Sequence, residues 1–386
     1  MNFEPPKIVQ DAAKEALTVV EANQYSHPRG RARLRNALKA SYSKLFNRDL
    51  DPETEILITA GANEGMFATF AAFLDKDDEV ICMEPFFDQY IANITMNGGK
   101  PVYVPLRPPA DASDRVISSA EWKLDIEELK SKITSKTKMI VLNTPHNPIG
   151  KVFNEDELKA IGQVAKEHNL IILSDEVYDR LYYPPLSKFP RIATLSDDLW
   201  QRTITVGSGG KSFAATGWRV GWLIGPDHLI QHAFAAQTRV VFCVNSPCQE
   251  AIAAGLEESA NEGSTLFPDQ INSYLRKRSI LADLFDELNL PYTMPEGAYY
   301  ILVNTAKIQI PKEFEFPAIL DERGDDFKMC YWLTKQIGVC AIPPSEFYEK
   351  QHWPLAANFA RFAFCKTDDV LEQAVERLKG LKAYIK

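Results

Sequence analysis

Lys211 is the residue around which a reactive site could be built, because an activated amine can attack a carbonyl group. It follows a β-branched run, residues 203–206, and a glycine-rich stretch, residues 207–210. The run predicts a buried strand, and the glycines predict a loop that lets the backbone come close to a ligand. Ser208 and Arg219 flank the lysine on either side. A lysine, a hydroxyl and a guanidinium at one strand end are typical of a site for an anionic ligand.

Three interpretations of this stretch compete. A phosphate-binding P-loop needs a glycine where the sequence has Thr205, and a helix that continues directly after the lysine. Thr216 and Gly217 would stop such a helix early, so a nucleotide-binding P-loop is the least favoured interpretation. A Schiff-base lysine for pyridoxal 5'-phosphate (PLP), and a solvated lysine on a surface turn, are equally favoured on this stretch alone.

The elements that would position these residues alternate along the chain. Apolar runs predict strands, and periodic or capped segments predict helices, at strand residues 57–59, 80–83, 102–104, 139–142, 170–173, 203–206 and 220–224 and helix residues 6–22, 31–46, 66–74, 124–133 and 154–168. Ile8, Ala12 and Ala16 define the predicted apolar side of the first helix. This alternation predicts an α/β fold, with a mostly parallel sheet covered by helices on both faces.

The chain after Arg219 is more helical, and it then mixes helices with short strands at residues 299–303 and 359–364. We therefore expect a large ligand-binding domain over residues 25–265 and a smaller α/β domain over residues 266–386. Residues 1–24 would form the N-terminal part of the small domain. The polar stretch 261–265 is the expected boundary.

Polar and aromatic residues follow several of the predicted strands, and in such sheets ligands bind outside the carboxyl ends of the strands. The residues at that edge are Phe87, Asn143, Asn147, Asp175, Tyr178, Ser208 and Lys211. Each has an ordinary structural explanation by itself, but an acid, a phenol, amides and an amine at one edge do not share one. Their convergence favours the PLP interpretation.

Each part of PLP needs a particular partner from this set. A protonated ring nitrogen needs a buried carboxylate, which Asp175 supplies, and Tyr178 and Asn147 can donate to the ring oxygen. Phe87 offers an aromatic plate for the ring face. The phosphate suits the helix start at Ala62 and Asn63, together with Ser208 and Arg219. Arg361 is suited to a bidentate contact with a substrate carboxylate.

Composition and charge limit the alternatives. The chain has 386 residues, of which 45% are hydrophobic and 25% are charged, and its net charge of −9 argues against nucleic acid as the main partner. Six cysteines without a CxxC pair indicate reduced thiols, and the histidine spacing predicts no metal site. We find no signal peptide or membrane-spanning run, and expect a cytoplasmic location with the mitochondrion as the alternative. Arg29, Arg31, Arg33 and Arg35 predict a solvated helix start.

Several longer stretches resemble the fold-type-I PLP-dependent aminotransferases over nearly the whole chain. They are Asn143-Thr-Pro-His-Asn-Pro-Ile-Gly-Lys-Val-Phe153, Ser174-Asp-Glu-Val-Tyr178 and residues 208–222. Glu84-Pro-Phe-Phe-Asp-Gln-Tyr90 and Ile342-Pro-Pro-Ser-Glu-Phe-Tyr348 are similar to the kynurenine aminotransferase group, whose members are also glutamine transaminases and cysteine-conjugate β-lyases.

This resemblance implies a homodimer with its active sites at the interface, where Tyr25 reaches the phosphate in the neighbouring subunit. Arg361 would hold the substrate carboxylate, helped by Asn147. The implied reaction moves the amino group of L-kynurenine, or of a related aromatic or sulfur amino acid, to a 2-oxo acid, and turns kynurenine into kynurenic acid. Asn63 stands where the family often has an aromatic residue, so we expect an altered side-chain pocket.

Two alternatives accompany this expectation. The same site could release a leaving group from the β-carbon of cysteine conjugates. The family also carries a glycine-containing segment just before the equivalent of Glu4-Pro-Pro6, and here only its end, Asn2-Phe3, is present, with Met1 where the rest should be. A shortened, inactive homologue that pairs with a full-length subunit is therefore the other alternative.

Overall fold

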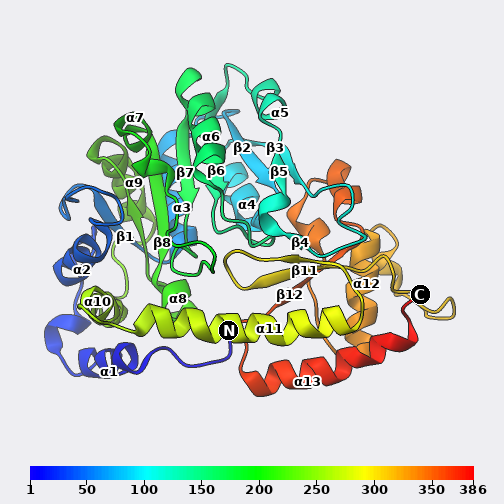
Figure 1. Cartoon of the computed structure of the whole chain (residues 1–386). Coiled ribbons are helices and arrows are strands. Elements are labelled where there is room, and N and C mark those ends of the chain that lie inside the picture. The colour runs from blue at the N-terminus through cyan, green and yellow to red at the C-terminus, as the bar shows by residue number, and fades with distance from the viewer.

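The computed structural model describes residues 1–386 and contains two sheets. In Figure 1 the large sheet lies above, and β11 and β12 of the small sheet lie below it and to the right. The large sheet has eight strands in the order β1-β9-β8-β7-β6-β2-β3-β5, and the small sheet has four in the order β12-β11-β10-β4. The strands are β1 (Ile56–Thr59), β2 (Glu79–Glu84), β3 (Lys100–Arg107), β4 (Ile117–Ser118), β5 (Lys123–Leu124), β6 (Thr137–Asn143), β7 (Ile171–Asp175), β8 (Thr203–Ser208), β9 (Gly221–Ile224), β10 (Tyr292–Met294), β11 (Tyr300–Asn304) and β12 (Phe359–Ala363).

Helices cover both faces of the large sheet, as the apolar strands require. The helices of the whole chain are α1 (Lys7–Ala16), α2 (Ala32–Tyr42), α3 (Ala62–Phe73), α4 (Asp88–Met96), α5 (Ile126–Ser131), α6 (Glu155–Glu167), α7 (Asp197–Gln201), α8 (Gly209–Ser212), α9 (Asp227–Val240), α10 (Ser246–Ala260), α11 (Leu266–Glu287), α12 (Asp325–Trp332) and α13 (Asp368–Leu378). The long α11 crosses the lower part of the molecule in Figure 1, with α1 and α13 below it. No helix combines the length and the apolar character that crossing a bilayer requires.

The centre of the large sheet is parallel, which confirms the predicted α/β class. Strands β8, β7, β6, β2 and β3 pair in parallel, whereas β9, β1 and β5 are antiparallel additions. Every residue of β8 is buried, and β7 is buried except for its first residue. Burial on both faces explains why these strands appear in the sequence as uninterrupted apolar runs.

The N-terminal helix is shorter than predicted and turns a different side inward. α1 ends at Ala16, and a separate 3₁₀ turn follows at Val20–Asn23. Val9 is fully buried against α10, whereas Ile8, predicted to lie on the apolar side, is 39% exposed. Ala16 is buried as predicted, so packing against α10 changes the predicted face mainly at its start, where Val9 replaces Ile8.

The basic run also differs from the prediction. Arg29 and Arg35 are buried rather than solvated, because their guanidinium groups bind backbone carbonyls of Thr54 and Pro52. Arg31 and Arg33 instead pair with Glu250 on α10. The run thus fastens α2 to its neighbours.

The two-residue strand β4, which lies at 117–118, pairs in parallel with β10 in the small sheet. The chain therefore contributes to the small sheet before it reaches the expected boundary at 261–265. The proposed domain boundaries stay a prediction. All six cysteines are free, and Cys82, Cys330 and Cys365 are buried.

Candidate active site

A cavity of about 550 Å³ lies where the carboxyl ends of the parallel strands face the small sheet. Every site residue predicted from the sequence lines it, except Tyr25. These residues are Ala62, Asn63, Phe87, Asn143, Asn147, Asp175, Tyr178, Ser208, Lys211, Arg219 and Arg361. The parallel register brings together side chains that are far apart in the sequence, because each follows its own strand or opens the next helix.

Asp175 ends β7 and is only 3% exposed. Burial raises the pKa of its carboxyl group, although a hydrogen bond donated by the Tyr90 hydroxyl, the Val177 N–H and the charge of Lys211 all oppose that shift. A buried carboxylate that faces a cavity is suited to bind a protonated ring nitrogen, which would restore the ionised form.

Asn143, at the end of β6, links the two loops that carry the polar residues. Its Nδ2 donates to the backbone oxygen of Asp175 at 3.1 Å, and its Oδ1 accepts from the backbone N–H of Asn147 at 2.8 Å. Both ends of the amide are therefore used inside the protein. In this structure Asn143 fixes the relative position of Asp175 and Asn147 at the cavity wall.

Lys211 lies in α8, a single helical turn that replaces the loop predicted for the glycine-rich stretch. Its Nζ donates to the hydroxyl of Tyr299 at 3.1 Å. Burial lowers the pKa of the amine, and the neighbouring charges of Arg219 and Arg361 lower it further, against the opposing effects of Cys365 and Asp175. A lysine with a lowered pKa has more of the neutral, nucleophilic form. The helix after Lys211 ends at Ser212, which contradicts a P-loop.

Arg361, on β12 of the small sheet, faces the same cavity from the opposite side. Its Nη1 donates to Asn147 Oδ1 at 2.8 Å, and its guanidinium lies 4.5 Å from the ring of Tyr300 and 4.8 Å from that of Phe347. Its Nε is buried without a hydrogen-bond partner. A rigid guanidinium with an unused buried donor fits a carboxylate ligand.

The other end of the cavity contains groups that are suited to bind a second anion. Gly61 caps α3 with φ +82° and no side-chain cap, so the first N–H groups of the helix are left for a ligand. A Cβ on Gly61 would lie 2.5 Å from Arg219 Nη2, which shows how closely the arginine packs on this helix start. Ser208, at the end of β8, lines the same end.

The residues in the cavity match the chemical groups of PLP. The unpartnered N–H groups of α3, Ser208 and Arg219 match a phosphate, the buried Asp175 matches a ring nitrogen, and Lys211 matches an aldehyde. The unused Nε of Arg361 stands apart from this group and remains for a substrate.

Tyr25 lies away from the cavity of its own chain. It is 86% exposed, and its ring contacts Phe242 edge to face. Asn63 does line the cavity, and its Oδ1 accepts from Asn93 Nδ2 at 3.0 Å. A polar, hydrogen-bonded side chain therefore occupies the position where an aromatic residue is common in the family that the motifs resemble.

Sequence reasoning missed the phenols that surround the lysine. Tyr300 lines the cavity and shares a 3.1 Å hydrogen bond with Tyr178, while Tyr299 contacts Lys211 and Tyr90 contacts Asp175. The only signal for Tyr299 and Tyr300 was their position directly after Gly297-Ala298 in a short strand. Nothing local indicated that this strand would face the large sheet.

Fold and cavity together define an α/β enzyme whose cavity holds a lysine of lowered pKa, a buried carboxylate, and groups suited to bind two anions. The chain belongs to the aminotransferase class I and II family, whose model matches residues 1–378. It is therefore a transaminase.

Relatives of similar length support this membership. A Saccharomyces cerevisiae protein described as a probable kynurenine–oxoglutarate transaminase is 47% identical over 385 residues, which cover 100% of this chain and 86% of that protein. Human kynurenine–oxoglutarate transaminase 3 is 36% identical over 385 residues, covering 98% of this chain and 83% of the relative.

Solved structures share the fold. The crystal structure of Bna3p from Saccharomyces cerevisiae has a TM-score of 0.96 at 47% identity and covers 100% of this chain and 90% of that one. A single mutant of aspartate aminotransferase from Thermus thermophilus has a TM-score of 0.83 at 27% identity, covering 98% and 89%. Because the fold is shared with a transaminase that is named for a different substrate, the fold alone does not identify the substrate of this chain.

Proposed function

We propose that this chain is a PLP-dependent transaminase that moves the amino group of L-kynurenine, or of a related aromatic or sulfur amino acid, to a 2-oxo acid. The single observation that carries the proposal is one cavity that holds both the Lys211 amine and the Arg361–Asn147 carboxylate site. The names of the yeast and human relatives support kynurenine as the donor. Transamination of kynurenine would give kynurenic acid after ring closure.

The residues that would hold PLP follow from the cavity. Asp175 would keep the ring nitrogen protonated, Tyr178 and Asn147 would donate to the ring oxygen, and Phe87 would lie against the ring face. Ser208, Arg219 and the start of α3 would bind the phosphate. When bound, PLP provides an electron sink for the electron pair left when the substrate Cα loses its proton.

The remaining steps belong to the side chains of this chain. Arg361 would bind the substrate carboxylate and so orient the Cα–H bond toward Lys211. The neutral lysine amine would take the proton from the substrate Cα and would deliver it to the aldehyde carbon of the cofactor, so that the amino group can leave the donor. The aromatic walls formed by Tyr300, Phe347 and Phe87 would exclude water from the site during this transfer.

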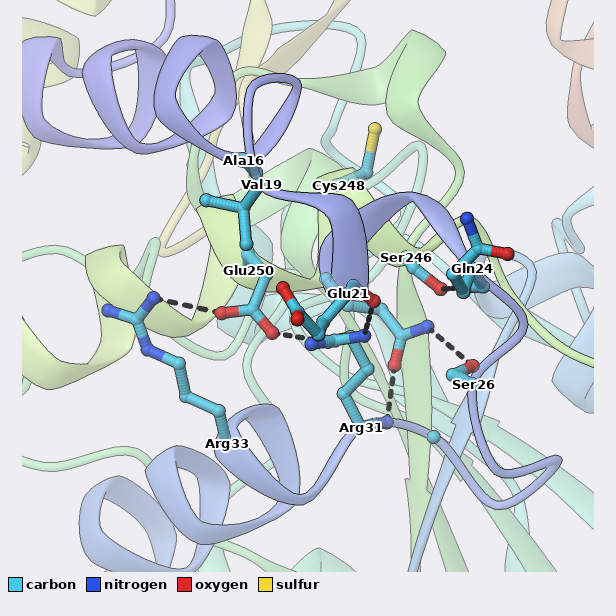
Figure 2. Close-up of polar contacts among 12 residues, drawn as sticks. Ala16, Val19, Glu21, Gln24, Ser26, Arg31, Arg33, Ser246, Cys248 and Glu250 are labelled. Carbon is cyan, nitrogen blue, oxygen red and sulfur yellow. Dashed lines mark hydrogen bonds and ion pairs between the residues drawn. The ribbon is translucent and has the colours of Figure 1, made fainter.

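We also infer that two copies form a dimer in which Tyr25 reaches the partner's phosphate site. The Tyr25 side chain is 86% exposed. The residues on either side of it, Gln24 and Ser26, are hydrogen-bonded to α10 (Figure 2). Ser246 donates to the backbone oxygen of Gln24 at 2.9 Å, and Gln249 donates to Ser26 at 3.3 Å. A fixed backbone that presents an exposed tyrosine supports a role outside its own subunit.

The test is a panel of amino donors with the PLP-loaded protein, followed by the conversion and recovery of the cofactor absorbance. We expect L-kynurenine and aromatic or sulfur amino acids to react faster than aspartate. Lys211→Ala should abolish turnover and the cofactor band, whereas Lys335→Ala, at an exposed lysine, should change neither. Pyruvate release from a cysteine conjugate without a 2-oxo acid would reveal β-elimination. No reaction with any kynurenine-like donor would overturn the proposed substrate class.

A further inference from the structure

Glu84 is a fully buried carboxylate that the transaminase mechanism does not use. It ends β2, its side chain is 0% exposed, and it does not line the cavity. Burying an unpaired charge is costly, so partners must compensate it. Both of its side-chain oxygens are bound by a segment far along the chain: Oε1 accepts from the backbone N–H of Glu349, and Oε2 contacts His352 Nδ1.

His352 is the side chain that contacts this carboxylate. It is 20% exposed, which keeps it within reach of solvent. Arg107, a cation whose charge also acts on Glu84, pairs with Glu128 instead. Burial raises the pKa of Glu84, and the contacts with Glu349 and His352 oppose that shift. Glu84 is therefore held by one short stretch of chain.

That stretch is also a wall of the active site. Residues 344–355 form two short 3₁₀ helices, Pro344–Phe347 and Lys350–Leu355. Glu346 and Phe347, in the first of these, line the cavity. The Phe347 ring lies 4.8 Å from the Arg361 guanidinium. A shift of this segment would therefore change the surroundings of the proposed carboxylate site.

A backbone hydrogen bond joins the same two regions closer to the cavity. The N–H of Phe86, two residues after Glu84, donates to the backbone oxygen of Phe347 at 2.8 Å. Phe87, the next residue, lines the cavity on the side of the large sheet. The contact between Glu84 and His352 is therefore adjacent to the contact between Phe86 and Phe347, and Phe347 in turn contacts Arg361.

We propose that Glu84 and His352 form a latch that pins residues 344–355 to the end of β2 and so positions Phe347 and Arg361 for the substrate carboxylate. Both are positioning residues, because neither lines the cavity. The inference rests on the proposed role of Arg361 in binding that carboxylate. The latch acts on substrate binding, whereas Asp175, Ser208 and Arg219, which would hold the cofactor, lie outside the pinned segment.

The experiment compares His352→Leu with His352→Asn, because the Nδ2 of asparagine can replace Nδ1 of histidine as a donor to Glu84. The latch predicts that His352→Leu raises the KM for the amino donor about tenfold, as expected for the loss of one charge-assisted hydrogen bond to a buried carboxylate. The kcat and the absorbance of the bound cofactor should remain near wild type. His352→Asn should keep the KM within about twofold.

Binding without turnover gives a second readout. The dissociation constant of 3-phenylpropionate, a carboxylate that cannot react, should rise in parallel with KM when measured by calorimetry on the PLP-loaded protein. Arg323→Gln is the matched control, because it removes an exposed ion pair with Glu346 on the same segment and leaves the latch intact. We expect no change in either constant for this variant.

The outcomes separate the latch from an ordinary structural ion pair. Equal KM values for His352→Leu and wild type, or a KM change matched by loss of the cofactor band, would overturn the latch. Failure of the wild-type protein to bind 3-phenylpropionate, or unchanged binding in Arg361→Met, would instead overturn the proposed role of Arg361.

Discussion

At the scale of single residues, the surroundings of Lys211 determine how it can act. Its amine has one side-chain hydrogen bond, to Tyr299, whose ring stacks on that of Tyr274. The cavity around the lysine is otherwise formed by groups assigned above to cofactor or substrate. Tyr299 is thus suited to hold the free amine in place for proton transfer.

We expect Tyr299→Phe to lower kcat about tenfold, because the amine would lose its orienting partner while the ring packing is kept. The donor KM should change by less than about twofold, and the isotope effect of a Cα-deuterated donor on kcat should increase. Tyr274→Phe is the matched control, since its hydroxyl is buried without a hydrogen-bond partner. A tenfold loss in that control as well would refute an orienting role for the Tyr299 hydroxyl.

The buried carboxyl group of Glu64 makes the stability of the folded protein depend on pH. It lies in the first turn of α3, and burial raises its pKa to about 7, although the Ala60 N–H bonded to its Oε2 opposes the shift. A carboxyl whose pKa is raised on folding favours the folded state below its unfolded value of 4.5, and that contribution is lost as the pH rises toward 7. The ionised Glu64 therefore destabilises the fold at neutral and alkaline pH.

Glu64→Gln should accordingly raise the free energy of unfolding at pH 8 by about 1–2 kcal/mol, and by clearly less at pH 5. Urea denaturation of the cofactor-free protein at both pH values measures this. Glu372→Gln, at an exposed position of α13, should have no effect at either pH. A gain from Glu64→Gln that is the same at pH 5 and pH 8 would contradict the raised pKa.

At the scale of elements, local signals predicted helix starts better than helix faces. Asn154 and Glu157 suggested a capping box, and the structure has one: the Asn154 side chain accepts from the N–H of Glu157, and the Glu157 side chain accepts from the N–H of Asn154. Such a motif lies within four residues and needs no tertiary contact. The inward face of α1 depends on α10, more than two hundred residues away, and the prediction was right for Ala16 but wrong for Ile8.

Glu157, in the first turn of α6, also pairs with a buried lysine, and the contribution of this ion pair to stability can be tested. The Lys151 side chain is 1% exposed, and its Nζ donates to Glu157 Oε1 at 2.9 Å. Glu157→Ala should destabilise the protein by about 3 kcal/mol, because it leaves a buried ammonium group uncompensated. Glu155→Ala, in the same helical turn, should cost less than about 1 kcal/mol because its partner Lys188 is exposed. Thermal unfolding of both variants measures the difference, and equal costs would contradict it.

The predicted site residues came from the ends of strands, and that is why they were found. Asp175 and Ser208 end apolar runs, and the parallel topology places such ends at one edge. Tyr90, Tyr299 and Phe347 reach the site or its partners from a helix, the turn before a small-sheet strand and a 3₁₀ turn. Their contribution depends on how the two sheets are placed, which no local pattern encodes; Arg361, in the middle of β12, was predicted only because the expected chemistry needed a partner for a substrate carboxylate.

At the scale of the whole molecule, the cavity is shared between the two sheets. Lys211 and Asp175 come from the large sheet and the turn after it, whereas Arg361 comes from the small sheet. Cofactor and substrate would thus be held mainly by different parts of the chain. A contact between these parts, such as that of Glu84 with His352, can therefore change substrate binding without changing the cofactor site.

One surface of the molecule has the apolar character expected of the inferred dimer interface. Tyr25 is 86%, Leu17 65%, Val20 69% and Phe242 50% exposed. The rings of Tyr25 and Phe242 are 5.5 Å apart, and Leu17 and Tyr25 line one surface hollow beside Cys243. Soluble monomers rarely leave so many large apolar side chains together in water, which supports burial against a second copy.

The double variant Tyr25→Asp with Phe242→Asp should raise the dissociation constant of the dimer by about 30-fold or more, because two aromatic anchors are replaced by charges that the interface would desolvate. Sedimentation at several protein concentrations measures this. Ile319→Asp, at a residue that is 79% exposed elsewhere, should leave the mass unchanged. Tyr25→Phe should keep the dimer but weaken PLP retention, because only the hydroxyl that would reach the partner's phosphate is lost. A wild-type protein that sediments as a monomer at micromolar concentration, yet retains PLP, would contradict both the dimer and the role of Tyr25 in it.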